Sequence, residues 1–588
     1  MNSLSKNFIK NVTGLLVLSI SLAGMTSCSS NKDEGVSNIE GTTLNITVKG
    51  LEELGSAAGA VGATNSKMRA AVPNGQAGSS QDGELISLGQ LDALVSVEEN
   101  RISSNANITK NTSSAALASA GNDTTYTEGN ALPLGNKLLA ATQAMGPNIK
   151  YRILLYDATN NLVVNTVATS GVNPQIQIYA NRKYTWYAFS VNETGGTVPN
   201  INSAGIIAKS EIANKDVLYA SGSINTINGA NYLDVTFKRN TARIQVKLDT
   251  RGLFGTIDNA TSISVLKNSG NTNVIQIGDL NIKTGAYSNL VNTSPVLASS
   301  MTAVSGTPTS TVKIANFYTV NTTAIAANSF KIRLNTLKVG LDDTRVRTFA
   351  PNLTYNYSNA YTPAIGSTYA LNIRLIESPV KVNGVLWARS NLVYNGSHMD
   401  RYRLKSNPGG SSSATRDTEF WNWKSTTPGG AAGNFDACAS VYPAGTWRMP
   451  TKAEWESIGQ PDDKREVLGL FWGAQYGYLW NRDSDYPANT AYDDNNLFLS
   501  FGGYRTTNWL GQVVVSGSPS GIVLGAFAAG ECHYWTSDSQ NTNNAYAVKS
   551  SFTRVAWLFS WGNVTYPSAS KTEGRNVRCV RAKVNPTS

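Results

Sequence analysis

Residues 233–248 read LDVTFKRNTARIQVKL, with apolar side chains at every second position on both sides of a polar turn. Successive side chains of a β-strand point to opposite faces, so this alternation predicts two half-buried strands. Similar alternating segments, separated by turns rich in Asn, Gly and Thr, run from residue 151 to about residue 376. Examples are Ile153–Tyr156, Gln175–Ile178 and Thr185–Phe189. We therefore expect an all-β region built from antiparallel strands.

The composition excludes several classes of protein. A chain of 588 residues with 41% hydrophobic residues has enough apolar material for more than one core. Four cysteines are too few for a disulfide-dense scaffold, and two histidines argue against a multi-histidine metal enzyme. The formal charge of +10 includes no run of three consecutive Lys or Arg residues, which argues against a nucleic-acid partner. No cofactor is expected.

The N-terminus predicts export. Lys6 and Lys10 precede the apolar segment Gly14–Gly24, which is far short of the ~20 residues that a membrane-spanning helix needs. Met25-Thr26-Ser27-Cys28 resembles the lipobox of bacterial lipoproteins, and the polar residues 29–34 resemble a surface-export tag. Residues 1–28 are then a lipoprotein signal peptide with Cys28 acylated at the outer membrane. The alternative is an ordinary signal peptide with an incidental cysteine.

A separate C-terminal domain is indicated by an abrupt change of composition. Of the 12 tryptophans only Trp186 precedes Trp387, and both histidines lie after Trp387 as well. The sequence Thr451-Lys-Ala-Glu454 is typical of a capping box and predicts a helix that continues to Ile458. We assign residues 382–588 to this domain. Residues 50 to about 145, rich in Gly, Ala, Ser, Thr and Asn, are predicted to be loops around a few weak strands.

The order of several motifs resembles the fimbrillins, the pilins of type V fimbriae of Bacteroidota. The motifs follow the lipobox and are Thr43–Lys49, Tyr184–Phe189, Phe237–Ile244 and Tyr369–Leu375. The resemblance covers roughly residues 1–378. It implies two tandem antiparallel β-sandwiches of the fimbrillin, transthyretin-like type, which we place at residues 70–238 and 239–378.

The resemblance also implies a mechanism of assembly. Fimbrillins are cut after an Arg, which removes the lipid and the first strand and opens a groove for a donor strand from a shaft or adaptor pilin. Asn65–Arg69, followed by Ala70, is similar to the cleavage site, and residues 29–69 would be the propeptide with the removable strand Leu44–Val48. Arg101 is a competing site. Arg69 would otherwise be an exposed basic residue in a flexible loop.

The last ~200 residues contain a second series of motifs. They are Trp387–Leu392, Asp436–Cys438, Trp447–Trp455, Tyr534–Ser537 and Asn576–Arg581. Their order resembles the Fibrobacter-type major paralogous domain, an α+β module of the C-type-lectin-like kind found on surface proteins. In that setting Cys438 and Cys579 could be joined by a disulfide, although Cys532 could be the partner of Cys579 instead.

Three tryptophans and four aspartates are the candidate ligand-contacting residues. Trp421, Trp423 and Trp509 are candidates for stacking on a sugar or a peptide, against the alternative that they are core residues. Asp483, Asp485, Asp493 and Asp494 offer oxygen ligands for calcium, but a solvated acidic loop is the favoured interpretation, so no metal is assigned. Cys532 and His533 are neighbours in sequence, which alone does not make a nucleophile. We expect no enzyme activity.

These observations lead to one function and two alternatives. The expected protein is a fimbrial tip or accessory subunit, first a lipoprotein of the outer membrane and then part of the fimbrium. Its C-terminal domain would adhere to a glycan or protein on a host or bacterial surface. A folded domain after residue 375 would prevent the last strand from acting as a donor, so the subunit would be terminal. The alternatives are a permanently lipid-anchored glycan-binding protein and a secreted hydrolase.

Overall fold

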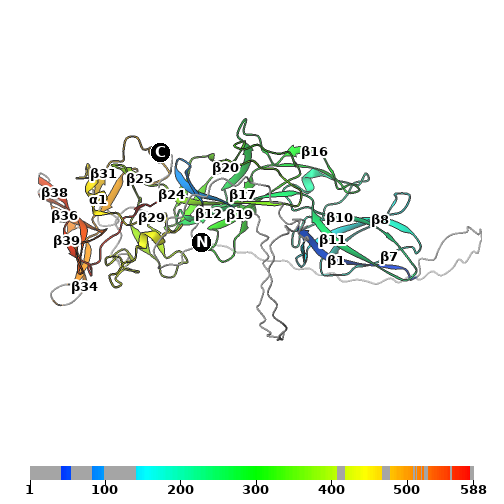
Figure 1. Ribbon diagram of the computed structural model, residues 1–588, viewed down its shortest axis with the longest axis horizontal. Coiled ribbons are helices and arrows are strands. Elements are labelled where there is room, and N and C mark those ends of the chain that lie inside the picture. Colours follow the sequence, from blue (N-terminus) through cyan, green and yellow to red (C-terminus); the bar gives the residue numbers. More distant parts are fainter. Residues whose placement is uncertain are drawn as a thin grey trace, which may run out of the picture.

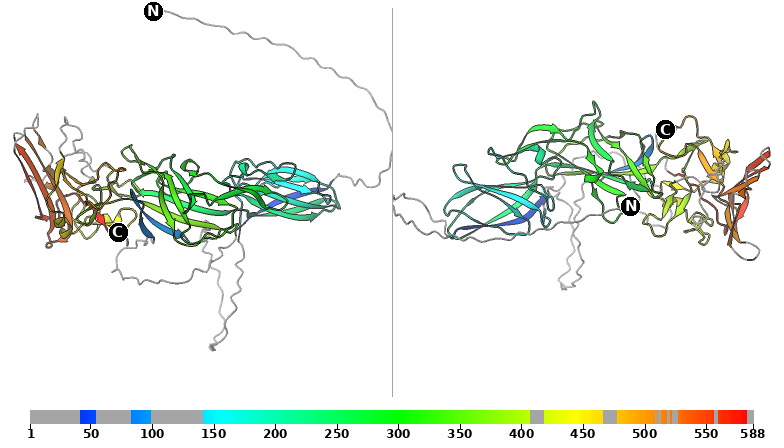
Figure 2. Two further views of the ribbon diagram at one scale, coloured as in Figure 1. Left: turned by 90° about the horizontal axis from the view of Figure 1, so that it is seen from above. Right: turned by 180° about the vertical axis from the view of Figure 1, so that it is seen from behind.

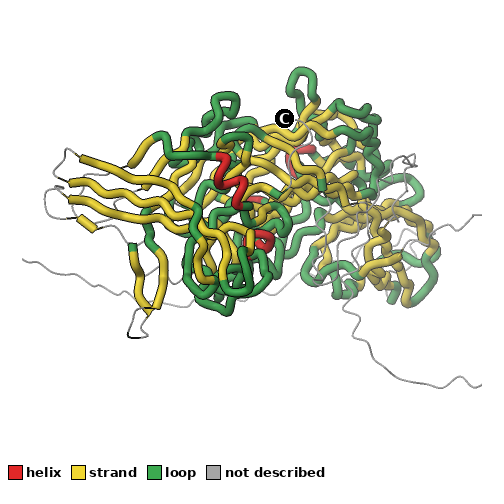
Figure 3. The backbone as a smooth tube through the Cα atoms, turned by 60° about the vertical axis from the view of Figure 1, so that its left-hand side comes forward, coloured by secondary structure: helices red, strands yellow, loops and turns green. Residues whose placement is uncertain are grey.

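The computed structural model shows an elongated molecule made of three units in a row (Figures 1 and 2). The structure describes residues 41–53, 83–98, 141–406, 418–465, 477–507, 510, 513–517, 520–521, 527–555 and 559–582. Strands dominate all three units, so the predicted mainly β fold is confirmed (Figure 3). In the described part of the chain, no helix is long and apolar enough to span a membrane.

The first unit is one eight-stranded sheet that curls around a single core. The strand order is β4-β1-β11-β10-β8-β5-β6, and β7 pairs with β1. Its core contains alternate residues of each long strand, among them Tyr151, Trp186 and Phe237. The strands are β1 (Thr43–Glu53), β4 (Ala141–Gln143), β5 (Lys150–Tyr156), β6 (Leu162–Thr169), β7 (Gln175–Gln177), β8 (Lys183–Ser190), β10 (Leu218–Asn225) and β11 (Ala230–Arg239).

The second unit is a sandwich of two main sheets, with a third small sheet at its side. One main sheet has the order β18-β19-β12-β24-β3-β2, the other β17-β14-β20-β23, and the small one β13-β21-β22. The apolar faces of the two main sheets meet in one core. The strands of the first sheet are β2 (Glu84–Ser87), β3 (Leu91–Glu98), β12 (Ala242–Gly252), β18 (Thr302–Ala303), β19 (Val312–Thr319) and β24 (Thr368–Glu377). The others are β13 (Gly255–Ile257), β14 (Ser262–Lys267), β17 (Val296–Leu297), β20 (Phe330–Thr336), β21 (Lys338–Leu341), β22 (Val346–Thr348) and β23 (Leu353–Tyr357).

The boundary predicted for the first sandwich, residues 70–238, is wrong for one segment. The hairpin of β2 and β3 lies in the second unit, where β3 pairs with β24 from Ala370↔Glu98 to Glu377↔Leu91. The physical reason is that alternation shows that a segment forms a strand but not which strand it pairs with. Two pairings, β1 with β11 and β12 with β24, are also parallel rather than antiparallel.

A hairpin of the second unit packs against the first unit. Strands β15 (Gln276–Asn281) and β16 (Tyr287–Asn292) form it, and β15 also pairs with β9 (Ile206–Ile207). Leu280 and Ile282 share a buried cluster with Leu154 and Phe189 of the first unit. The first and second units are therefore joined by an apolar contact, not only by the chain.

The third unit is closed by its own two ends. Strand β40 (Val580–Arg581), near the C-terminus, pairs with β26 (Val385–Trp387) and with β29 (Trp447–Arg448).

The predicted capping box is confirmed, with Thr451 and Glu454 bonding each other's backbone N–H at the start of α1 (Lys452–Ser457). Other strands are β25 (Val380–Val382), β27 (Leu392–Tyr394), β28 (Tyr402–Leu404), β30 (Asp463–Arg465), β31 (Gly477–Trp480), β32 (Leu497–Ser500), β33 (Tyr504–Thr507) and β34 (Val513–Ser516). The outer sheet contains β35 (Ser520–Gly521), β36 (Phe527–Ser539), β37 (Asn544–Val555), β38 (Phe559–Thr565) and β39 (Ser568–Ser570).

Candidate functional site

Strand β1 is an integral part of the first core. It runs parallel to β11, with Thr43 opposite Ala230 and Glu52 opposite Lys238. Leu44 and Ile46 are completely buried, and such side chains contribute about 1.5–3 kcal/mol each. On the other edge of β1, β7 and β4 pair only with its two ends. Removal of β1 would therefore expose an apolar trough and the unpaired backbone of β11.

The side chains of β1 make few polar contacts. Asn231 of β11 links to Thr43 and Asn45 by part-buried hydrogen bonds, and the ion pairs lie near the surface. Lys49 pairs with Asp234 at 3.4 Å and Glu52 with Lys238 at 3.1 Å, and three of these four side chains are more than half exposed. Exposed ion pairs contribute about 0–1 kcal/mol. The strand is consequently held mainly by backbone bonds and apolar side chains, which another strand with the same alternation could supply.

The predicted processing residues lie outside the described residues. These are Cys28, Arg69 and Ala70. In the sequence, Arg69 stands between the end of β1 at Glu53 and the start of β2 at Glu84.

A buried ion pair joins the second and third units. The Arg581 guanidinium donates to the Asp92 carboxylate at 2.5 Å and to the carbonyl of Glu377 at 2.8 Å. It also stacks on the indole of Trp447, 4.0 Å from the ring centroid. Burial raises the pKa of Asp92 and lowers that of Arg581, so each charge relies on the other. This pair connects β3 to β40, the described strand nearest the C-terminus.

The loop 481–496 was expected to be solvated, and this is wrong for part of it: Asp485 and Asp493 are exposed, but Tyr492 and Asp494 are buried. Tyr492 from this loop lies in the core of the second unit, edge-on to Phe349 with ring centroids 6.0 Å apart. The guanidinium groups of Arg347 and Arg389 lie 4.4 and 4.1 Å from its ring centroid. The loop is therefore an anchor between the units. Sequence reasoning missed it because an anchoring tyrosine among acidic and amide residues has no periodicity.

The four calcium candidates belong to this anchor and have separate contacts. Asp483 accepts from the backbone N–H groups of Asn383 and Gly384, at 2.6 and 2.9 Å. The other contacts are Asp485 with Lys381 at 2.7 Å, Asp493 with Arg345 at 2.7 Å, and the carbonyl of Asp494 with Arg389 at 2.6 Å. Among the described residues, no group of three or more His, Cys, Asp or Glu side chains is placed to hold a metal ion.

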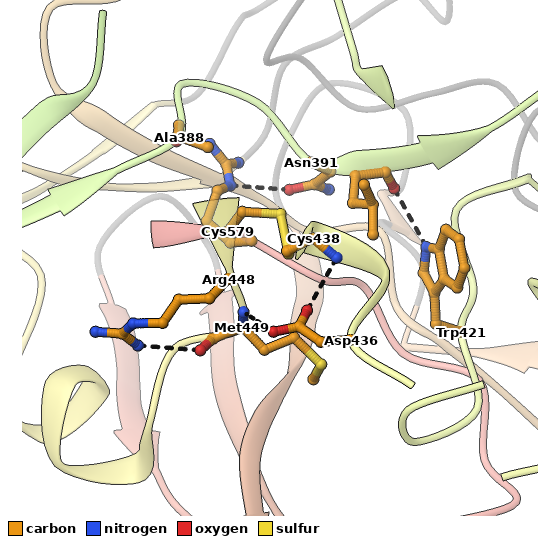
Figure 4. The surroundings of a disulfide bond; sticks show 10 residues. Ala388, Asn391, Trp421, Asp436, Cys438, Arg448, Met449 and Cys579 are labelled. Carbon is orange, nitrogen blue, oxygen red and sulfur yellow. Dashed lines mark hydrogen bonds between the residues drawn. A yellow bond between two sulfur atoms is a disulfide. The ribbon is translucent and has the colours of Figure 1, made fainter. Parts of the chain in front are cut away.

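A disulfide of the third unit lies in a buried cluster that also includes Leu94 and Ile376 of the second unit (Figure 4). Cys438 is bonded to Cys579, with the Cα atoms 5.7 Å apart, and Cys532 is free and buried. The Asp436 carboxylate accepts from the backbone N–H groups of Cys438 and Met449, both at 3.0 Å. The sequence left the choice between Cys438 and Cys532 open, and the structure pairs the former.

Two of the three tryptophans proposed as ligand contacts are core residues. Trp421 and Trp423 are only 1% and 4% exposed. The Trp421 indole N–H donates to the carbonyl of Leu392 at 3.3 Å and that of Trp423 to Thr536 at 2.9 Å. Their prediction as ligand contacts is wrong, because this segment pairs with Arg575 inside the unit. Trp509 lies outside the described residues.

A buried polar cluster around His533 was not predicted. One ring nitrogen faces Glu531 at 2.8 Å and the other accepts from Arg575 at 2.5 Å, while Tyr504 packs on the ring. Burial and the neighbouring Arg575 charge lower the pKa of His533 to about 4. Burial also raises the pKa of the Cys532 thiol to about 12. With both ring nitrogens engaged and the thiol protonated, this pair is unsuited to nucleophilic catalysis.

Comparisons with known proteins give remote similarities only. No family model and no curated protein matches the chain. The chain is similar to a candidate cell adhesion protein from Bacteroides fragilis, with 14% identity over 43% of this chain and 92% of the other, and a TM-score of 0.28. A fimbrial assembly protein from Parabacteroides distasonis matches with 10% identity over 38% and 83%, TM-score 0.21. The fimbrial anchor protein of Porphyromonas gingivalis matches with 9% identity over 32% and 69%, TM-score 0.18.

Proposed function

We propose that this chain is a fimbrial tip or accessory subunit that adheres through its third unit. The observation that carries the proposal is β1, a buried strand held mainly by backbone bonds and apolar side chains. In this proposal the chain is exported as a lipoprotein on Cys28 and cut after Arg69. A donor strand from a shaft or adaptor pilin then takes the place of β1 beside β11.

The choice of Arg69 over Arg101 is supported by what each cut would release. A cut after Arg69 separates β1 and leaves β2 and β3 attached to the rest of the chain. A cut after Arg101 would also separate β3, which carries Asp92 and pairs with β24 along the buried junction. Only the first cut opens one groove and keeps the second and third units intact.

A terminal position is supported by the chain that follows β24. This strand ends at Glu377, and β25 of the third unit begins at Val380. The carbonyls of Glu377 and Ser378 accept from Arg581 and Arg389, both buried. The segment after β24 is thus committed to the third unit and cannot serve as a donor strand. A subunit with a groove and without a donor strand ends a fimbrium.

The third unit lies at the opposite end of the molecule from the first (Figure 1). A subunit attached through the first unit would therefore present the third unit outward. We propose that this outward end binds a glycan or a protein on a host or bacterial surface.

The test is the N-terminal sequence and intact mass of the protein isolated from its native cell surface. A start at Ala70 without lipid is expected, and Arg69→Ala should abolish it while the neighbouring Lys67→Ala does not. An acylated start at Cys28 would overturn the proposal in favour of a permanently anchored glycan-binding protein. Turnover of a polysaccharide by the purified chain would overturn it in favour of a hydrolase.

A further inference from the structure

Exposed apolar side chains gather at the free end of the first unit, around the first residues of β1. Tyr179, Ile227 and Tyr232 are 40%, 64% and 74% exposed. The backbone N–H of Ile178, next to Tyr179, donates to the carbonyl of Thr42 at 3.1 Å, and Tyr232 pairs with Asn45 of β1. We call Tyr179, Ile227 and Tyr232 the end face. Large exposed apolar groups next to each other commonly mark a contact surface.

The loops that carry the end face are fixed by internal hydrogen bonds. The buried Thr226 hydroxyl donates to the carbonyl of Tyr179 at 2.7 Å and accepts from the N–H of Arg182 at 3.1 Å. The Asn231 side chain accepts from the N–H of Ile227 at 2.9 Å and donates to its carbonyl, also at 2.9 Å. The apolar groups are thus presented in a set arrangement, which lowers the entropy cost of binding.

Two basic side chains lie beside the end face. Arg182 and Lys183 are exposed, and neither forms an ion pair with another described residue. The one carboxylate of the turn after β5, Asp157, accepts from the N–H groups of Thr159 and Asn161. A complementary partner would have an apolar face with acidic groups at its rim.

We propose that the end face docks the fimbrial subunit that supplies the donor strand. This inference rests on the proposed function and adds the place where the body of that subunit sits. A strand that replaces β1 beside β11 has to leave the groove at one of its two ends. At the Glu53 end, β11 continues within a few residues into β12, and the second unit packs there. At the Thr43 end lie the end face and, before it in sequence, residues 1–40. The partner's body therefore sits on the end face.

The test compares the variant Ile227→Ser/Tyr232→Ser with a matched control, Leu297→Ser, at a 49% exposed apolar residue of the second unit. Each variant replaces the natural protein in its native bacterium, and the fraction of the protein in sheared fimbriae is measured by immunoblot. Loss of two central apolar contacts should lower that fraction about tenfold, and the control should leave it unchanged. Thermal unfolding of the purified variants checks that both fold.

Three outcomes would separate the two proposals. Wild-type incorporation by the Ile227→Ser/Tyr232→Ser variant would overturn the end face as a docking surface and leave the proposed function intact. Absence of the natural protein from fimbriae would overturn the proposed function itself. If the purified natural protein is a dimer that this variant converts to a monomer, the occupant is a second copy of this chain and the inference is wrong.

Discussion

The ion pair between Asp92 and Arg581 should be one of the strongest single contacts of the junction between the second and third units. Both side chains are buried, at 7% and 4% exposure, and they are 489 residues apart in the chain. We expect Asp92→Leu alone, or Arg581→Met alone, to lower the free energy of unfolding by about 3–5 kcal/mol, because each leaves a buried charge without its partner.

The double variant should be less destabilised than the sum of the two single variants. Replacing a buried ion pair by apolar side chains of similar size changes the free energy of unfolding little. We therefore expect the double variant to lose about 2 kcal/mol, from the lost stacking of Arg581 on Trp447.

The pH dependence of the Arg581→Met variant has a defined sign. Because burial already raises the pKa of Asp92, the carboxyl in the Arg581→Met variant can take up a proton, and this variant should regain stability as the pH falls.

The assay is denaturant unfolding followed by tryptophan fluorescence, because 11 of the 12 tryptophans lie from Trp387 onward and report on the third unit. Glu456→Gln removes the surface ion pair with Lys452 on α1 of the third unit and serves as the control, with an expected loss below ~1 kcal/mol. A loss below about 1 kcal/mol for Asp92→Leu, or strict additivity in the double variant, would refute this reasoning.

Three further predictions concern the third unit. The pKa of His533 is lowered to about 4 from an ordinary 6.5, so the folded state favours the neutral ring. About 3 kcal/mol of the free energy of unfolding, present above pH 6.5, should therefore be lost as the pH falls towards 4. Unfolding at several pH values should show this slope in the natural protein, and its persistence in His533→Gln would contradict the assignment. Replacing both Cys438 and Cys579 by Ala opens a loop with a sequence separation of 141 and should cost about 4–5 kcal/mol, measured by the same unfolding assay; unchanged stability would count against it. Burial raises the pKa of Cys532 to about 12, so iodoacetamide should label it at pH 8 only after denaturant is added, and rapid labelling of the folded chain would show the thiol to be accessible.

Local features of this fold could be predicted from the sequence because they depend on neighbouring residues. The alternation in residues 233–248 corresponds to β11 and β12, and that in Thr185–Phe189 to β8. The capping box of Thr451 and Glu454 needs only residues three apart, and it occurs as expected. Period and spacing report which side chains share a face.

The partners of each face could not be predicted in the same way. Trp421 and Trp423 looked available for a ligand because a sequence shows their spacing and not the strand that covers them. The partner of Asp92 is Arg581, and the Tyr492 ring contacts two arginines from different units. Contacts over hundreds of residues leave no local pattern, and the buried junction consists of such contacts.

The place of the β2–β3 hairpin has a consequence for the order in which the chain can fold. Because synthesis starts at the N-terminus, residues 84–98 are made long before their pairing partner β24 at Thr368–Glu377. Arg581, the partner of Asp92, is made later still. The first unit is interrupted by this same hairpin, since β1 precedes it and β4 follows it. Contacts of such high sequence separation form slowly. The second and third units therefore cannot complete their junction until nearly the whole polypeptide has been made, so this junction forms at the end of synthesis.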